Sequence, residues 1–331
     1  MIGKDEPLLP YLFEIVTRPE GKAGVLAGGL GLRLKRDFLN LTNAKTLFDV
    51  VPELRATSDM DFLLRMDLWA KKDEGTGEFP AKGFRAMLVE LGYQDVINSW
   101  NFKKPYAGID GKFVVLDLQA RLPKSDDEGK TIEAEEGIKV KDNQVGRGMK
   151  VNLSGLVTPE AFAFEDSPIE FEIENGGGTA SIQVPHPYAW LNLKVAAAQD
   201  WLLEIEGGKT PKKPLDNGDS RRLKHVTDVY IIVGMMTDEE LTLAERLASK
   251  YVDLLIAKTI REGAKALFGT KESEGCLAIK AHNGGELSAH FDENYEVFWD
   301  ALSRALGVGL AAAAPVIAAD EEATADVEVK S

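Results

Sequence analysis

The sequence has only one cysteine, four histidines and no long uninterrupted apolar run. Cys276 has no second cysteine with which to form a disulfide, so a disulfide-stapled fold is excluded. A membrane helix needs roughly 20 consecutive apolar residues, and no such run occurs, so we expect no membrane partner. The segment Met1 to Pro10 also lacks the basic region and apolar stretch of a secretory signal. These absences predict a cytoplasmic protein.

Positive charge is also scarce, with 39 basic against 54 acidic residues and a formal net charge of -15. The deficit is uneven: residues 1–125 hold 18 basic and 17 acidic residues (+1), which leaves 21 and 37 (-16) for residues 126–331. Nucleic-acid binding depends on clustered Lys and Arg. The first 125 residues therefore neither exclude a nucleic-acid partner nor indicate one.

The first part of the chain alternates strand and helix patterns. The apolar run Lys22 to Ala27 predicts a strand that stops at the Gly28-Gly29 turn, and helical spacing follows over Leu30 to Phe38. Two further strands and one helix are predicted, at Ser58 to Met66, Lys112 to Leu122 and Pro80 to Leu91. This order favours an α+β fold with a mixed sheet in the N-terminal part.

The rest of the chain changes in composition. Residues 124–142 are polar and acidic, as in a loop or linker, and Val151 to Val184 has the short broken runs of a small antiparallel β element. From Tyr188 the spacing is helical, with helices expected over Asp238 to Ala257 and Asn294 to Leu306 and a loop at Lys209 to Ser220. The predicted parts are a sheet domain at 1–123, an acidic loop and β-rich insertion at 124–184, a helical domain at 185–306 and a disordered acidic tail at 307–331.

Asp59 and Asp61 are two residues apart in a strand pattern, so their carboxylates share one face of the sheet. Two like charges in one small space need a compensating cation or a shifted pKa, and a hard divalent ion such as Mg²⁺ is the simplest compensation. The alternative is a pair of solvated acids at the end of a strand.

Asp117 interrupts the apolar run Phe113 to Leu118, which has the pattern of an interior strand. A carboxylate there needs a partner. If this strand lies beside the strand of Asp59 and Asp61, three carboxylates converge; otherwise Asp117 is a core acid balanced by Lys or Arg. Gly28-Gly29 has two readings as well, a phosphate-binding turn or a simple chain reversal.

The order of these elements resembles the minimal nucleotidyltransferase fold of the DNA polymerase β superfamily. Residues 55–62, RATSDMDF, resemble the RxTxDxDF motif of the AbiEii-type nucleotidyltransferase toxins. His186-Pro-Tyr with Lys194 and Ala197 resembles the third motif of that family, and residues 221–228, RRLKHVTD, resemble its fourth, RxxKDxxD. The matches are scattered over residues 22–235.

The resemblance implies a transferase that moves NMP from an NTP to an acceptor hydroxyl. In it Asp59 and Asp61 would hold Mg²⁺, with Mn²⁺ as an alternative, against the triphosphate, and Asp117 would complete a second metal site and deprotonate the acceptor. Lys194 would meet the β- and γ-phosphates, and Asp228 would orient Lys194 or the nucleotide. The implied nucleotide-binding residues are Gly28, Gly29, Thr57, Ser58, Lys194, Arg221 and Lys224.

The resemblance further implies an RNA acceptor such as a tRNA 3′ end, and a toxin of a toxin–antitoxin or phage-defence system with a cognate antitoxin. Two features depart from the family pattern. His225 stands where the fourth motif has its first Asp, and 29 residues separate Gly29 from Asp59, so an insertion between Phe38 and Leu54 is expected to crowd or extend the site. The alternatives are a nucleotidyltransferase acting on a small molecule or a protein hydroxyl, and a catalytically silent nucleotide-binding or antitoxin-partner module.

Overall fold

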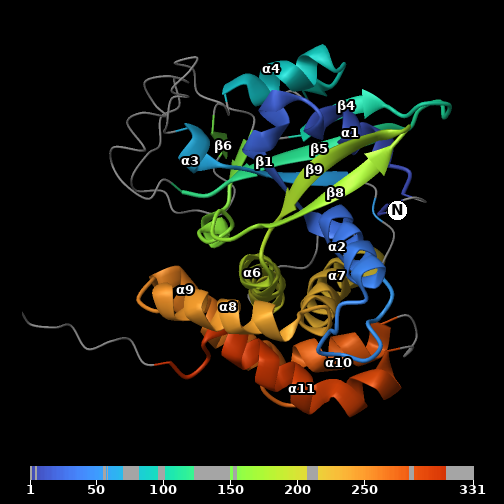
Figure 1. Ribbon diagram of the computed structural model, residues 1–331. Coiled ribbons are helices and arrows are strands. Elements are labelled where there is room, and N and C mark those ends of the chain that lie inside the picture. The colour runs from blue at the N-terminus through green and yellow to red at the C-terminus, as the bar shows by residue number, and fades with distance from the viewer. Residues whose placement is uncertain are drawn as a thin grey trace, which may run out of the picture.

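The structure, a computed structural model, describes residues 2–3, 6–54, 57, 59–69, 82–95, 101–122, 150–151, 155–206, 215–282 and 287–310. The fold is α+β (Figure 1). A mixed sheet, its flanking helices α1 and α4 and the β8–β9 hairpin form one half, and helices α6 to α11 form the other. No described helix is both long and apolar enough to cross a lipid bilayer.

The main sheet has seven strands in the described residues. They are β1 (Gly24–Ala27), β2 (Asp59–Leu64), β3 (Gln94–Asp95), β4 (Asn101–Pro105), β5 (Phe113–Ala120), β6 (Lys150–Val151) and β7 (Gly155–Val157). The order is β1-β2-β5-β4-β3, and β7 pairs with both β5 and β6. Strands β2 and β5 run parallel at the centre, whereas β1 and β4 flank them antiparallel. The predicted mixed sheet is therefore present.

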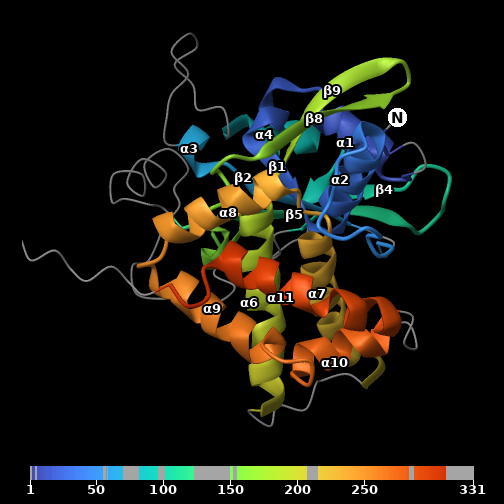
Figure 2. The same cartoon turned by 60° about the horizontal axis from the view of Figure 1, so that its bottom comes forward.

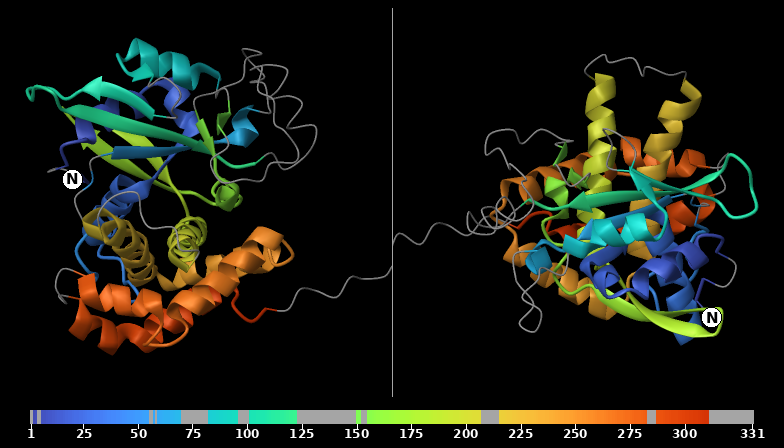
Figure 3. Two further views of the ribbon diagram at one scale, coloured as in Figure 1. Left: turned by 180° about the vertical axis from the view of Figure 1, so that it is seen from behind. Right: turned by 90° about the horizontal axis from the view of Figure 1, so that it is seen from above.

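The two faces of the central strands differ in chemistry. On β2 the side chains of Met60 and Phe62 are fully buried, and Phe62 packs on Phe84 of α4 with their ring centroids 5.6 Å apart. Because side chains alternate along a strand, Asp59 and Asp61 project from the opposite face. That second face looks toward the helical half of the molecule, as the two views in Figure 3 show.

Ten α-helices and two short 3-10 helices are described around the sheet. They are α1 (Leu9–Val16), η1 (Pro19–Ala23), α2 (Gly28–Thr42), α3 (Met66–Trp69), α4 (Lys82–Glu90), η2 (Pro159–Ala161), α6 (Pro187–Glu206), α7 (Leu215–Gly234), α8 (Asp238–Lys250), α9 (Leu255–Phe268), α10 (Glu274–Ala281) and α11 (Ser288–Leu306). Figure 2 shows α6 and α7 side by side, leading away from the sheet. These two helices carry the functional candidates of the second half of the chain.

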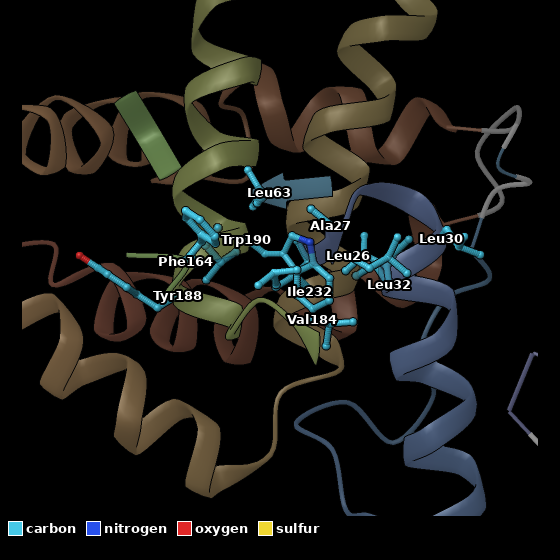
Figure 4. Packing of buried hydrophobic residues seen from close by; sticks show 14 of the residues in the cluster. Leu26, Ala27, Leu30, Leu32, Leu63, Phe164, Val184, Tyr188, Trp190 and Ile232 are labelled. Atoms are coloured by element: carbon cyan, nitrogen blue, oxygen red, sulfur yellow. The ribbon is translucent and has the colours of Figure 1, made fainter. Parts of the chain in front are cut away.

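One continuous apolar core joins the sheet to the helices. Trp190 of α6 is fully buried where β1, α2 and α7 meet, next to Leu26, Leu32 and Ile232 (Figure 4). Val184, the last residue of β9, lies in the same cluster. Because this core anchors α6 directly behind the end of β1, it also sets the position of the polar residues on the next turn of α6.

The region Val151 to Val184 differs from the expected antiparallel element. The strands β8 (Ile169–Asn175) and β9 (Gly178–Val184) form a separate antiparallel pair, and β6 and β7 also pair antiparallel, but β7 in addition joins the main sheet parallel to β5. The run AFAF, residues 161–164, is a turn whose apolar side chains are buried in the core. These residues are apolar because they are buried in the core, and in the sequence alone this apolar run predicts part of a strand.

Three helix boundaries also differ from the prediction. The segment Asp238 to Ala257 is two helices, because α8 ends at Lys250 and α9 begins at Leu255. The predicted loop Lys209 to Ser220 is helical from Leu215 onward. Helix α11 begins at Ser288, six residues before the predicted start. The predicted linker 124–142 and residues 311–331 of the predicted tail lie outside the described residues.

The insertion after α2 packs on the helical half of the molecule. The N–H groups of Leu47 and Phe48 donate to the carbonyls of Met236 and Gly234, at 2.8 and 3.2 Å, just where α7 ends. The Phe48 ring lies against Gly234, where a β-carbon would overlap it, and against Tyr230 with ring centroids 4.9 Å apart. We call residues 43–54 the clasp, since they tie α2 to the end of α7.

Candidate active site

Asp61 and Asp117 are direct neighbours across the parallel β2–β5 pair. Asp59 is paired with Val115, one step of the pleat away on the same face. The two strands are therefore adjacent, as the sequence prediction required, and Asp61 and Asp117 lie side by side, although the three carboxylates do not form a ready-made group of metal ligands among the described residues. The Thr57 hydroxyl lies 3.2 Å from both the carbonyl oxygen and Oδ1 of Asp59, which orients that carboxylate.

The surroundings of Asp117 shift its pKa. Burial raises its pKa to about 6, and the negative charges of Asp61 and Asp59 add to the rise. Asn101, its neighbour across the β4–β5 pair, donates a hydrogen bond to Oδ1 and, with the Lys224 charge, works in the opposite direction. A carboxyl with a pKa near 6 can accept a proton near neutral pH and still release it.

Gly28 allows the backbone to pass directly beside Asp61. Ala27, the last residue of β1, is paired with Asp61, and Gly28 follows with a positive φ of 63°. A β-carbon on Gly28 would overlap the Asp61 carboxylate. This position therefore requires glycine for both its backbone angle and its close approach. The sequence predicted a Gly28-Gly29 turn with a helix starting at Leu30. In the structure α2 begins at Gly28 itself, and Gly29 is buried in its first turn.

A cavity of about 290 Å³ lies between this face of the sheet and the helices. Its lining residues come from β1, α2, β2, β5, the segment 158–160, α6 and α7: Ala27, Gly28, Asp61, Gln119, Thr158, Pro159, Glu160, Leu193, Lys194, Ala196, Ala197, Asp200, Lys224 and His225. Six of the positions singled out in the sequence thus share one cavity: Gly28, Asp61, Lys194, Ala197, Lys224 and His225. The clasp contributes no lining residue, contrary to the expectation that this insertion crowds or extends the site.

Lys194 and Asp228 form a buried ion pair between α6 and α7. The Nζ of Lys194 lies 2.7 Å from Oδ2 of Asp228, and both side chains are almost wholly excluded from solvent. Lys194 reaches the cavity, whereas Asp228 lies behind it. Asp228 therefore holds the ammonium group at the cavity wall opposite Asp61.

His186 does not line the cavity, and it stabilises the start of α6 instead. It precedes α6, and its Nδ1 accepts a hydrogen bond of 3.2 Å from the Tyr188 N–H, which caps the first turn of the helix. Burial lowers the pKa of His186 to about 3, helped by the positive charge of Lys35. The imidazole is therefore neutral at physiological pH and stabilises the helix that carries Lys194.

Two of the predicted residues lie wholly or in their side chains outside the described part of the chain. Ser58 lies outside the described residues, and Arg221 lies in α7 with its side chain outside the described part. His225, which departs from the family pattern, lines the cavity beside Lys224.

Sequence reasoning missed several polar residues of the site. Asn101 comes from a strand that was not predicted, and Thr158 and Glu160 follow β7, whose pairing with β5 brings them to the cavity. No local pattern marks these three. Asp200 had a signal, because Leu193, Ala197 and Asp200 recur at helical spacing on the face of α6 that carries Lys194.

The donor set fits a divalent ion that arrives with a phosphate ligand. Among the described residues, no three His, Cys, Asp or Glu side chains form a ready-made metal-ligand group. Mg²⁺ characteristically takes one or two carboxylates together with waters and substrate phosphates instead of an all-protein cage. The three aspartates supply such carboxylates, and a cation would relieve the repulsion that helps to raise the pKa of Asp117.

Comparison of the chain with models of known protein families, with curated proteins and with solved structures found no significant match.

Proposed function

We propose that this protein is a Mg²⁺-dependent nucleotidyltransferase that transfers NMP from an NTP to a hydroxyl of an RNA acceptor. The observation that carries the proposal is the pairing of Asp61 with Asp117 on a sheet face whose cavity has Lys194 and Lys224 on the opposite, helical wall. Phosphoryl transfer needs mainly positioning and neutralisation of charge, and this arrangement has groups for both. The sequence resemblance to the DNA polymerase β superfamily supports the same reaction.

Each residue has a defined part in the proposed reaction. Bound Mg²⁺ would be held by Asp59 and Asp61, with Asp117 at a second ion, and would neutralise charge on the phosphates. The Asp117 carboxylate accepts the proton of the acceptor hydroxyl, whose oxygen forms a bond to the α-phosphorus of the NTP. The bond between the α-phosphorus and the bridging oxygen breaks, and pyrophosphate leaves with that oxygen.

The cations of the helical wall act on the triphosphate. Lys194, fixed by Asp228, lies opposite Asp61 across the cavity and pairs with the β- and γ-phosphates. Lys224 adds a second positive charge from α7, close enough to Asp117 to oppose the rise of its pKa. Gly28 lines the cavity at the start of α2, where N–H groups favour anions.

The test is transfer of radiolabel from each α-³²P-labelled NTP to total cellular RNA in the presence of Mg²⁺. We expect label on RNA with the wild-type protein, and a loss of several orders of magnitude in Asp59→Ala and Asp61→Ala. Asp253→Ala is the matched control, because Asp253 is exposed in the helical half and lies outside the cavity. Normal transfer by Asp61→Ala would refute the proposal.

The other results of this assay are equally informative. Label on protein or on a small molecule would reassign the acceptor and keep the reaction. No label, together with measurable binding of Mg-NTP, would identify a silent nucleotide-binding module. The toxin role that the resemblance implies predicts growth arrest on expression of the wild-type chain and none with Asp61→Ala.

A further inference from the structure

The face of the sheet that carries the three aspartates continues past the cavity onto β4 and β3. Asn101 is paired with Asp117, Lys103 with Val115, and Pro105 with Phe113, so these side chains share one face. Gln94 of β3 is paired with Lys103 and extends the face to the edge of the sheet. The cavity has no lining residue from β3 or β4. The face therefore has two parts, a covered cavity and an open continuation.

The open continuation is unlike an ordinary solvated strand surface. Phe113 is 48% exposed although it lies on a central strand, and Val115 beside it is half-buried. Lys103 is exposed, and no described residue forms an ion pair with it. The β4–β5 hairpin extends beyond the helices (Figure 3). An aromatic ring, a cation and an amide thus lie together on a surface continuous with Asp117.

Geometry assigns the two parts to different substrates if the proposed function holds. The cavity has Lys194, Lys224 and Gly28, which suit the triphosphate, so the acceptor hydroxyl must reach Asp117 from the other side. Lys103 lies one pleat repeat along from Asp117, about 7 Å, and Phe113 lies two repeats along, about 13 Å. A chain whose terminal hydroxyl is at Asp117 passes first the cation and then the aromatic ring.

We propose that the surface formed by Gln94, Lys103 and Phe113 binds the single-stranded 3′ end of the RNA acceptor. Phe113 stacks on a base, Lys103 pairs with a backbone phosphate, and Gln94 forms hydrogen bonds at the edge of the sheet. Exposed aromatic rings next to cations are the usual means of binding single strands without strict sequence preference. The inference rests on the proposed function, since it uses Asp117 as the point where the acceptor reacts.

Equilibrium binding of a 5′-fluorescein-labelled single-stranded RNA, followed by anisotropy without NTP, tests this surface. We expect Phe113→Ala to weaken binding by about fivefold or more and Phe113→Trp to retain it. Lys103→Gln weakens binding at low salt and reduces the salt dependence of the dissociation constant. Val297→Ala and Lys258→Gln are the matched controls, because both residues are exposed on α11 and α9 in the helical half.

A transfer assay with the same RNA separates the two proposals. In Phe113→Ala the KM for RNA should rise while the KM for NTP stays unchanged. If the wild-type protein transfers label but the Phe113 and Lys103 variants bind RNA like the controls, this surface is wrong and the function stands. If the protein binds RNA through these residues but transfers nothing, the function is wrong and the surface stands. Absence of any RNA binding would overturn the surface.

Discussion

At the scale of single residues, Asp117 is placed where its charge is unfavourable. It is largely buried, lies beside Asp61, and has one amide donor, Asn101, and the more distant charge of Lys224 to offset these effects. A group held in this way costs folding free energy and is typical of a functional position. The cost is measurable because it depends on pH.

The pKa of Asp117, about 6 in the folded protein, lies above the value of about 3.9 for an unfolded chain. The folded state therefore holds its proton more tightly, and this carboxyl lowers stability progressively as pH rises from about 4 to about 6. We expect Asp117→Asn to be about as stable as the wild type near pH 4 and about 1–2 kcal/mol more stable at pH 7.5, after allowance for partial solvent exposure. Urea unfolding in metal-free buffer measures the difference.

The control for this measurement is Asp253→Asn, in which an exposed carboxyl is removed and no pH-dependent gain is expected. A constant difference between Asp117→Asn and the wild type across this pH range would contradict the raised pKa.

Gly28 gives a second prediction at this scale. Alanine at this position must adopt a φ of 63° and displace the Asp61 carboxylate. We expect a loss of about 1–2 kcal/mol of stability, and a much larger loss of transfer activity, since the carboxylate moves out of place. Thermal unfolding together with the label-transfer assay measures both effects. Gly108→Ala is the control, because it also has positive φ but open space around it. Equal loss of activity in both variants would contradict a specific role for Gly28.

At the scale of elements, the ion pair between Lys194 and Asp228 joins two helices. Removing one partner leaves the other charge buried, so Asp228→Ala should cost about 3 kcal/mol or more. Replacing both partners by apolar residues, in Lys194→Met with Asp228→Leu, should cost less than the single change. Urea unfolding of the single and double variants decides this. A double variant less stable than Asp228→Ala would show that the pair contributes net stability.

The elements around the aspartates were predictable because local signals agreed. The strands at Asp59–Leu64 and Phe113–Ala120 have alternating or apolar patterns bounded by polar residues, and the glycines mark the end of β1. Strand β4 was not predicted because its sequence, NFKKP, is short and mostly polar. It lies next to β3, the strand at the edge of the sheet. The break between α8 and α9 was missed because apolar periodicity continues through it, and the turn at Tyr251 has no proline or glycine.

At the scale of the whole molecule, the pairing of distant segments decided the site and could not be read from local sequence. The prediction that three carboxylates converge depended on β2 lying beside β5, and the sequence had no observation to establish that adjacency. The same holds for Glu160, which reaches the cavity because β7 pairs with β5. The position of the clasp was predicted wrongly for a similar reason. The sequence shows the length of this insertion but not its hydrogen bonds to the end of α7.

The clasp gives a prediction for the whole molecule. Phe48 is fully buried against α7, so Phe48→Ala leaves a cavity and should cost about 3 kcal/mol. Hydrogen exchange should rise at the amides of Leu47 and Phe48, which lose their protection as the clasp loosens. Val50→Ala, an exposed position in the same segment, is the control and should change neither quantity. Unchanged exchange in Phe48→Ala would show that the clasp is held by its backbone alone.

The division of the cavity between distant parts of the chain has a consequence for synthesis. The aspartates and Gly28 lie within the first 117 residues, whereas Lys194 and its partner Asp228 come from α6 and α7. During synthesis the carboxylates of Asp61 and Asp117 therefore leave the ribosome long before Lys194 is made. Strand β1 is likewise not covered by Trp190 until α6 has been made. The cavity forms only after α7 has left the exit tunnel, so a nascent or truncated chain that ends before α7 has an incomplete cavity.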